Sequence, residues 1–174
     1  MKKTLFAFTL FAFTATSAAA QNPVSDSLRS SWGGAKRNIK ESAEQMSEAN
    51  YNFKPSPDVR TFGEILAHVA GASYLFCAAA KGEKSPFAEE AFEKTATTKA
   101  AIVKVTNDAI AYCDGAYAAA TDATLGQMVA NPFGSGQVPR ANPLIGQIGH
   151  DNEHYGNLIT YFRIKGMVPP SSKR

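Results

Sequence analysis

Apolar residues recur at intervals of three and four positions in four long stretches of this sequence. This spacing collects them on one face of a helix, and such a face has to be buried against other helices. The sequence shows no strand pattern of any length. It therefore predicts an all-α fold, a four-helix bundle. Its helices are expected at about residues 23–50, 61–82, 95–119 and 142–165.

Local signals mark the ends of these helices. Thr61 and Glu64 match a capping box, in which the threonine is the N-cap. Asn142 and Pro143 suit the N-cap and the first position of the last helix. Gly166 suits the left-handed position that ends a helix.

A long irregular crossover is expected before the last helix. Residues 121–142 are rich in Gly, Pro, Asn and Ser. A connection of this length is unusual in a compact domain. It is compatible with a lid or a binding loop, and equally with a passive connection.

The first 20 residues have the three parts of a secretory signal peptide. Lys2 and Lys3 form a positive start, an apolar stretch follows at 4–14, and small residues favour cleavage after Ala20. A membrane anchor is the alternative, but so short an apolar stretch cannot cross about 30 Å of hydrocarbon. We therefore expect a signal peptide at 1–20, a single bundle domain at 21–174, and a periplasmic or secreted protein.

The charge of the mature chain argues against nucleic acid as a partner. Without Lys2 and Lys3 the chain has 16 basic and 15 acidic residues, whereas nucleic-acid-binding domains are strongly basic. No membrane association is expected after the signal peptide is removed. The sequence leaves a homodimer open and does not identify the small-molecule substrate.

The chain has three histidines, two of them four residues apart. On a helix, His150 and His154 stand on the same face, where two neutral imidazoles can bind one metal ion. His68 is the only histidine left to provide a third ligand. The alternative is two solvated histidines and one hydrogen-bonded core histidine. Apolar neighbours favour a buried metal site, namely Ile65, Ala72, Ile148, Tyr155 and Leu158.

Two stretches of the sequence resemble the DinB/YfiT-like superfamily. Residues 62–70 are similar to the second helix of that family, and residues 150–157 with 163–166 are similar to its fourth. The resemblance implies a bundle with a three-histidine metal site. The family includes thiol-dependent S-transferases and isomerases as well as proposed hydrolases. By position, the ligands implied here are His68, His150 and His154.

Residues 150–154 also match the His-x-x-Glu-His pattern of inverzincin proteases. That site requires an acidic ligand from further along the chain, but no Asp or Glu follows Glu153. The protease interpretation is therefore excluded. Glu153 lies roughly 60° from His150 around the helix and could be an outer acceptor or a base, and Asp151 is the mirror case relative to His154. Because a charge at such a position is more often on a solvated face, we expect both there and assign no catalytic residue.

The two cysteines leave two alternatives. Cys77 and Cys113 could form a disulfide in an exported protein, or they could be two small buried hydrophobic residues. Cys77 lies nine residues after His68, about 13–14 Å along a helix and on the opposite side of it. It is therefore excluded as a fourth ligand.

A divalent metal ion is the expected cofactor. Imidazole binds several such ions, and of these we expect zinc or nickel. Three neutral imidazoles leave the charge of the ion uncompensated, so that it can activate water or polarise a carbonyl. The leading hypothesis is an exported metal-dependent hydrolase. The alternatives are a non-catalytic metal- or ligand-binding bundle and a thiol S-transferase of the same family. An open coordination position that faces a pocket would favour an enzyme.

Overall fold

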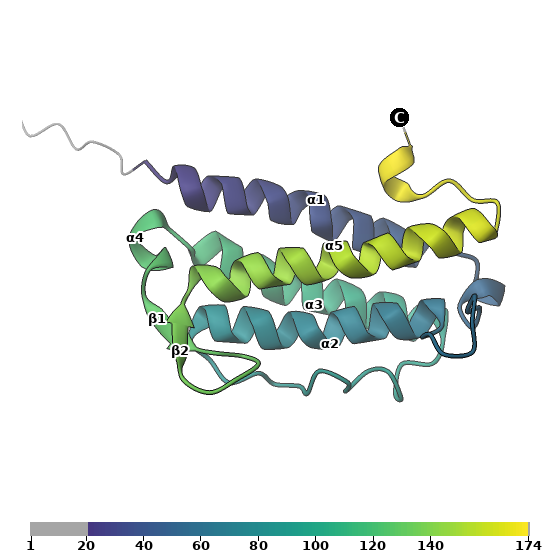
Figure 1. The fold of residues 1–174 in the computed structure, drawn as a ribbon, viewed down its shortest axis with the longest axis horizontal. Helices are drawn as coiled ribbons and strands as arrows, with labels where there is room; N and C mark the ends of the chain where they lie inside the picture. Colours follow the sequence, from purple (N-terminus) through teal and green to yellow (C-terminus); the bar gives the residue numbers. More distant parts are fainter. Residues whose placement is uncertain (1–20, 174) are drawn as a thin grey trace, which may run out of the picture.

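Four long helices form most of the described chain, residues 21–173 of this computed structural model (Figure 1). They are α1 (Pro23–Gln45), α2 (Phe62–Lys81), α3 (Lys99–Ala119) and α5 (Ala141–Ile164). The shorter elements are η1 (Glu48–Asn50), α4 (Asp122–Leu125), β1 (Met128–Ala130), β2 (Gln137–Pro139) and η2 (Pro170–Ser172). The predicted four-helix bundle is confirmed. The expected signal peptide lies outside the described residues.

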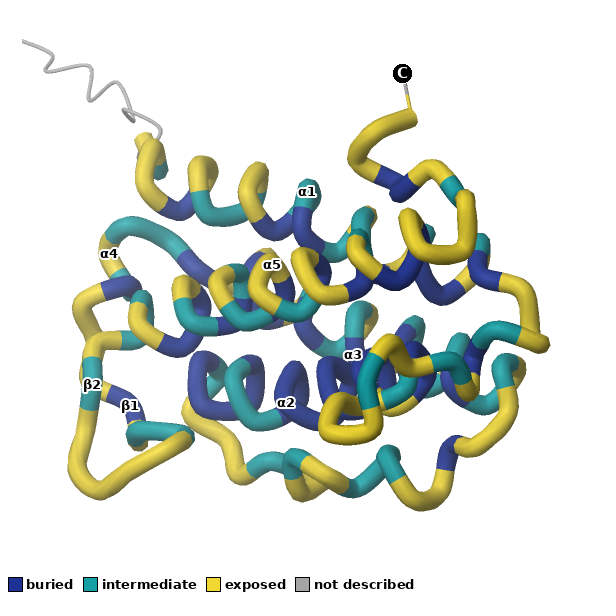
Figure 2. The backbone as a smooth tube through the Cα atoms, turned by 45° about the vertical axis from the view of Figure 1, so that its right-hand side comes forward, coloured by how far each residue is buried: buried dark blue, intermediate teal, exposed yellow. Residues whose placement is uncertain are grey.

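Helix α2 is the centre of the core. It packs chiefly against α3 and α5, and α1 packs against the same two helices, so α1 and α2 lie diagonally across the bundle (Figure 1). Figure 2 shows α2 buried over most of its length. The helix is long and apolar enough to span a membrane, but most of it is buried inside the bundle. It is therefore the core helix of this fold.

The sequence signals for the helix ends were partly right. The capping box at Thr61 and Glu64 is formed, and Gly166 has the expected left-handed conformation, with φ of 67°. However, α5 begins at Ala141, so Asn142 is not its N-cap. Pro143 is tolerated in this first turn because the N–H that it lacks would have no partner inside the helix there.

The crossover contains two short strands that the sequence did not predict. β1 and β2 pair antiparallel, with Val129 opposite Val138. Strands of three residues are too short to show an alternating pattern. The hairpin loop rests on α2, because the ring of Phe133 lies 4.8 Å from that of Phe76. The crossover therefore contains a short hairpin that packs against α2.

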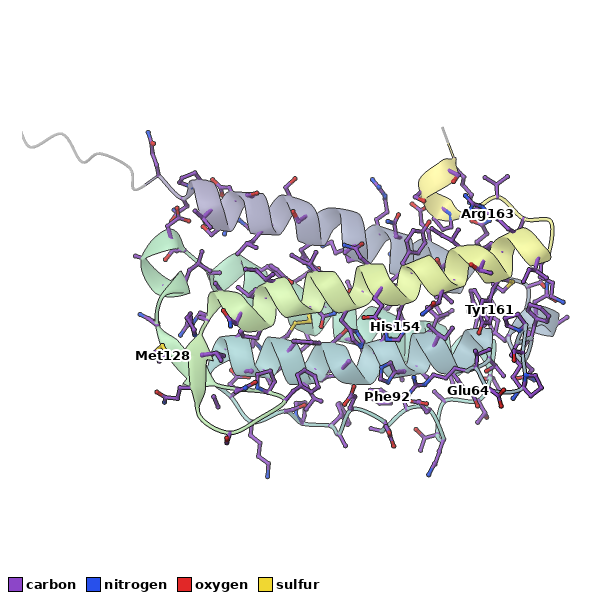
Figure 3. The ribbon with its side chains drawn as sticks, viewed as in Figure 1. Glu64, Phe92, Met128, His154, Tyr161 and Arg163 are labelled. Atoms are coloured by element: carbon purple, nitrogen blue, oxygen red, sulfur yellow. A yellow bond between two sulfur atoms is a disulfide. The ribbon has the colours of Figure 1, made fainter. Side chains whose placement is uncertain are left out.

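A disulfide joins α2 to α3. Cys77 and Cys113 are both fully buried, and their Cα atoms are 5.2 Å apart, within the range for a disulfide. The bond is drawn in yellow in Figure 3. Of the two alternatives for the cysteines, the structure has the disulfide.

Candidate metal centre

The fold brings the three predicted ligands together. His68 lies on α2, while His150 and His154 lie on successive turns of α5. One nitrogen of each ring lies within 4.8 Å of the nitrogens of the other two. The Nε2 atoms of His68 and His150 are 3.2 Å apart. Two ligands at about 2.1 Å from a tetrahedral ion would be roughly 3.4 Å apart, so the group fits a metal ion.

Burial lowers the pKa of two of these histidines, His68 and His154. Desolvation, with smaller contributions from His150 and His68, lowers the pKa of His154 to about 4. Desolvation also lowers the pKa of His68, assisted by the nearby guanidinium of Arg60. Since only the neutral ring has a free lone pair, both residues are prepared to bind a cation at neutral pH.

Glu93 orients the ring of His68. Its Oε1 atom is 3.1 Å from His68 Nδ1. Because a carboxylate only accepts, Nδ1 carries the proton and the lone pair of Nε2 faces His150. Arg60 holds the same carboxylate with its Nε and Nη2 atoms, at 3.0 and 3.3 Å. Arg60, Glu93 and His68 therefore form one continuous hydrogen-bonded chain.

The other two rings are not satisfied by the protein. Within residues 21–173, the Nδ1 atoms of His150 and His154 are buried and have no hydrogen-bond partner. The nearest carboxylate recorded for His150 Nδ1 is that of Asp151, whose Oδ1 atom is 4.0 Å away, beyond hydrogen-bond distance. A buried polar atom without a partner is costly. The rings that have these unsatisfied nitrogens belong to the same close group of three imidazoles, so the group fits a bound cation better than a hydrogen-bonded core.

The expectation of a solvated face was wrong for Asp151, whereas Glu153 is exposed. Asp151 is only 2% exposed and accepts a hydrogen bond of 2.7 Å from Gln147. Gln147 donates in turn to Ser73 on α2, at 2.9 Å. Burial raises the pKa of Asp151. The residue lies on a side of α5 that packs into the bundle, where Gln147 links it to α2.

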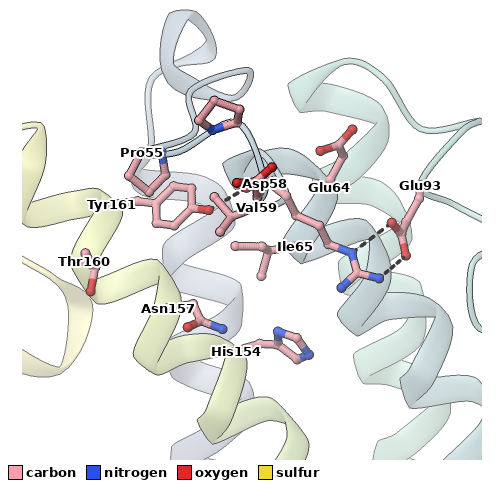
Figure 4. Close-up of a pocket in the computed structure, with 12 residues that line it drawn as sticks. Pro55, Asp58, Val59, Glu64, Ile65, Glu93, His154, Asn157, Thr160 and Tyr161 are labelled. Atoms are coloured by element: carbon pink, nitrogen blue, oxygen red, sulfur yellow. Dashed lines mark hydrogen bonds and ion pairs between the residues drawn. The ribbon is translucent and has the colours of Figure 1, made fainter.

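The histidine cluster adjoins a pocket of about 760 Å³ (Figure 4). His154 and Glu93 both line it, and the loop before α2 forms its outer wall, at residues 55–60. Tyr161 lines the opposite side and fixes this loop by donating its hydroxyl to the carbonyl of Arg60, at 2.5 Å. A small molecule in this pocket would therefore reach the histidine cluster at His154.

No fourth side chain closes the site. Over the described range 21–173, no further His, Cys, Asp or Glu joins the mutually close group of three. Three protein ligands and a free position are typical of catalytic rather than structural zinc sites. An ion in such a site keeps its positive charge and can polarise a carbonyl or activate water.

Sequence reasoning missed Glu93 and Arg60. Both lie in connections outside the long helices, and neither belongs to a motif. Charged residues in loops are usually solvated, so a Glu and an Arg in a loop did not indicate a functional site. The one available hint was that an Nδ1 proton on His68 would need an acceptor, which does not say where in the chain that acceptor lies.

Comparison with solved structures supports the same fold. A DinB-like protein from Bacillus cereus superposes with a TM-score of 0.66 at 16% identity, covering 83% of this chain and 95% of that one. YfiT from Bacillus subtilis, described as a probable metal-dependent hydrolase, has a TM-score of 0.62 at 14% identity, covering 88% and 94%. A mycothiol-dependent maleylpyruvate isomerase has a TM-score of 0.61 at 17% identity, covering 77% and 60%.

The sequence itself gives the family. No curated protein matches the chain. The family model described as the DinB superfamily, however, matches residues 33–158, which include α2 and both histidines of α5. Together with the bundle and its cluster of three histidines, this match establishes that the chain belongs to the DinB superfamily.

Proposed function

We propose that this protein is an exported metal-dependent hydrolase that uses a divalent ion held by His68, His150 and His154. The observation that supports it most is the open side of the histidine cluster, which adjoins the pocket lined by His154 and Glu93. A structural metal site would have a fourth protein ligand and no access for a substrate.

Each residue of the site has a defined role in this proposal. The three histidines hold the ion through neutral ring nitrogens. Glu93 keeps the proton of His68 on Nδ1, and Arg60 holds Glu93 in place. When bound, the ion supplies positive charge that polarises the substrate and activates water. The pocket positions the substrate against that open side.

Three further points favour an exported hydrolase, the first concerning export and the other two concerning hydrolysis. The buried disulfide between Cys77 and Cys113 is the kind of bond that persists in oxidising compartments. Hydrolysis needs only water, whereas thiol transfer needs a low-molecular-weight thiol that is expected in the cytosol. YfiT, which shares the fold, is itself described as a probable metal-dependent hydrolase.

The test is metal analysis followed by an activity screen. Protein purified from the exported fraction should contain about one divalent ion per chain, and should cleave one class among esters, amides and phosphoesters. A chelator should abolish that activity and added zinc or nickel should restore it, with His68→Ala as the inactive control. Activity that survives removal of the metal, or that requires an added thiol, would contradict the proposal.

Export has its own measurement. Cleavage after Ala20 predicts a mature protein that starts at Gln21, which intact-mass analysis of the exported protein would detect. A mass that includes Lys2 and Lys3 would contradict cleavage at this site.

A further inference from the structure

The connection between α2 and α3 runs along α2 (Figure 1) and approaches it closely at Gly71. We call residues 83–93 of this connection the strap. The contact depends on Gly71, one turn after His68, because a Cβ atom there would lie only 1.8 Å from the carbonyl oxygen of Glu89. No side chain fits into that space, so glycine lets the backbone of the strap reach the helix.

Aromatic side chains hold the strap on both sides of Glu89. The rings of Phe87 and Phe92 lie 4.8 and 6.0 Å from that of Tyr74 on α2, and 4.9 Å from each other. Such ring contacts stabilise by about 0.5–1.5 kcal/mol each beyond the area that they bury. The position of Glu89 is therefore set by its neighbours in the strap.

The carboxylate of Glu89 lies beside the metal-facing nitrogen of His68. Its Oε1 atom is 3.8 Å from His68 Nε2, the same atom that is 3.2 Å from His150 Nε2. Yet Glu89 is not part of the mutually close group of three histidines. It therefore stands at the edge of the ligand set, within reach of a water molecule bound beside His68 Nε2, and its side chain is 37% exposed.

Two other carboxylates of residues 21–173 approach a ring of the cluster, and both are held by further side chains. Glu93 is bound to both His68 and Arg60. Asp151, at 4.0 Å from His150 Nδ1, is buried against Gln147. Within the described residues, Glu89 is the carboxylate that approaches a ring of the cluster and is not held by another side chain.

We propose that Glu89 is the general base of the hydrolytic reaction, an inference that rests on the proposed function. Glu89 Oε1 would take one proton from the attacking water while the oxygen of that water forms a bond to the electrophilic carbon or phosphorus of the substrate. The same proton then passes to the leaving group as the bond to that group breaks. Water is consumed and no other reactant is needed. General bases of this kind contribute about 10²–10⁴-fold to a rate.

The decisive measurements do not depend on finding the substrate. Acetohydroxamate binds an exposed zinc ion and offers a hydrogen-bond donor to a neighbouring carboxylate. We would measure its affinity for the zinc-loaded wild type, Glu89→Gln and Glu90→Gln by calorimetry. Glu90 lies exposed on the same strap and is the matched control. Glu89→Gln should weaken hydroxamate binding by about 10–100-fold, since hydrogen bonds to charged groups are strong, and Glu90→Gln should have no effect.

The zinc affinity of Glu89→Gln shows whether Glu89 is a general base or a metal ligand. Competition with a chelator should give Glu89→Gln a zinc affinity within about threefold of the wild type, because the three histidines are intact. Zinc loss as large as in His68→Ala would make Glu89 a ligand and overturn the proposal. Unchanged hydroxamate affinity in Glu89→Gln, or no hydroxamate binding to the wild type, would overturn it as well.

The two proposals can fail separately. If the screen finds no hydrolysis while Glu89→Gln selectively loses hydroxamate, the hydrolase assignment fails but the placement of Glu89 at the open position holds. If hydrolysis is found and Glu89→Gln retains the wild-type rate, the hydrolase assignment holds and Glu89 is not the base.

Discussion

The two sides of α2 carry two different kinds of buried group. Cys77 faces α3 and is covalently bonded to Cys113 in a cluster with Trp32 and Tyr117. His68 faces α5, where the neighbouring rings of His150 and His154 still have buried nitrogens without partners. On the first side both sulfur atoms are bonded to each other. On the second side the protein offers no hydrogen-bond partner to two buried ring nitrogens. The disulfide side is therefore expected to determine stability, and the histidine side to determine binding.

The comparison also predicts that the two sides are independent. His68 and Cys77 are separated by about 13–14 Å along one helix. Mutational effects at such a distance usually add unless the sites share a partner. Each prediction below changes one side and measures both.

The largest effect is expected from removal of a metal ligand. His68→Ala leaves two ligands and should lower metal affinity by more than the roughly 100-fold that loss of an outer hydrogen-bond partner can cause. The helices should remain, because the apolar core does not depend on the ion. Metal content and circular dichroism, measured side by side, test this. The exposed residue Asn152 provides the control as Asn152→Ala, and full metal occupancy in folded His68→Ala would contradict the site.

Removal of the disulfide should change stability and leave binding intact. The bond closes a loop with a sequence separation of 36 residues, and the loop-entropy model gives about 3–4 kcal/mol for a loop of this size. We expect the Cys77→Ala, Cys113→Ala double variant to lose that much in urea unfolding. Its metal affinity should stay within about threefold of the wild type. A parallel loss of metal would show that the two sides are coupled.

Glu93→Gln tests the support of the histidine side. The amide can still accept a hydrogen bond from His68 Nδ1, but it loses the charge that pairs with Arg60. We expect metal affinity to fall by about 10–100-fold, as measured by chelator competition. Glu90→Gln on the same segment should bind like the wild type, and an unchanged affinity in Glu93→Gln would remove Glu93 from the metal site.

The smallest expected effect is the pH dependence of the metal-free protein. The folded pKa of His154 is about 4, below its ordinary value of 6.5. Between these values the unfolded chain binds a proton that the folded chain does not, so stability is full above pH 6.5 and falls as the pH decreases toward 4. After allowance for partial exposure, the loss from pH 7 to pH 5 should be about 1–2 kcal/mol.

Urea unfolding at several pH values measures this loss. His154→Gln lacks the titrating ring, and its stability should vary less over the same range. The disulfide does not titrate, so the double cysteine variant should show the full slope from a lower starting stability. A flat profile in the wild type would mean that His154 is protonated as easily in the folded state as in the unfolded chain.

The sequence by itself determined the features that depend on local geometry. The spacing of apolar residues gave the four helices, and the capping box and Gly166 gave two of their ends. The four-residue spacing of His150 and His154 placed both rings on one face of α5, because the period of a helix is fixed. His68 was the one histidine left to complete the set, and resemblance to the family implied the same ligand. The structure brings all three residues together.

Only the tertiary structure decided what surrounds those histidines. Glu93 and Glu89 come from a connection without any motif, and Gly71 admits that connection for a reason visible only in the contact itself. Asp151 was expected in solvent, yet it is buried because that side of α5 packs into the bundle, where Gln147 links it to α2. The positions of Cys77 and Cys113 in the sequence were compatible with a disulfide and with two free thiols, and the structure has the disulfide.

The physical reason is the range of the interactions. A helix repeats every 3.6 residues whatever packs against it, so its faces can be read from a single stretch of sequence. A hydrogen bond from a loop to a buried ring depends on where the chain returns in space, and the residue types along the loop do not encode that position. The three histidines could thus be predicted from helical periodicity. The positions of Glu93 and Glu89 beside them depend on the tertiary structure.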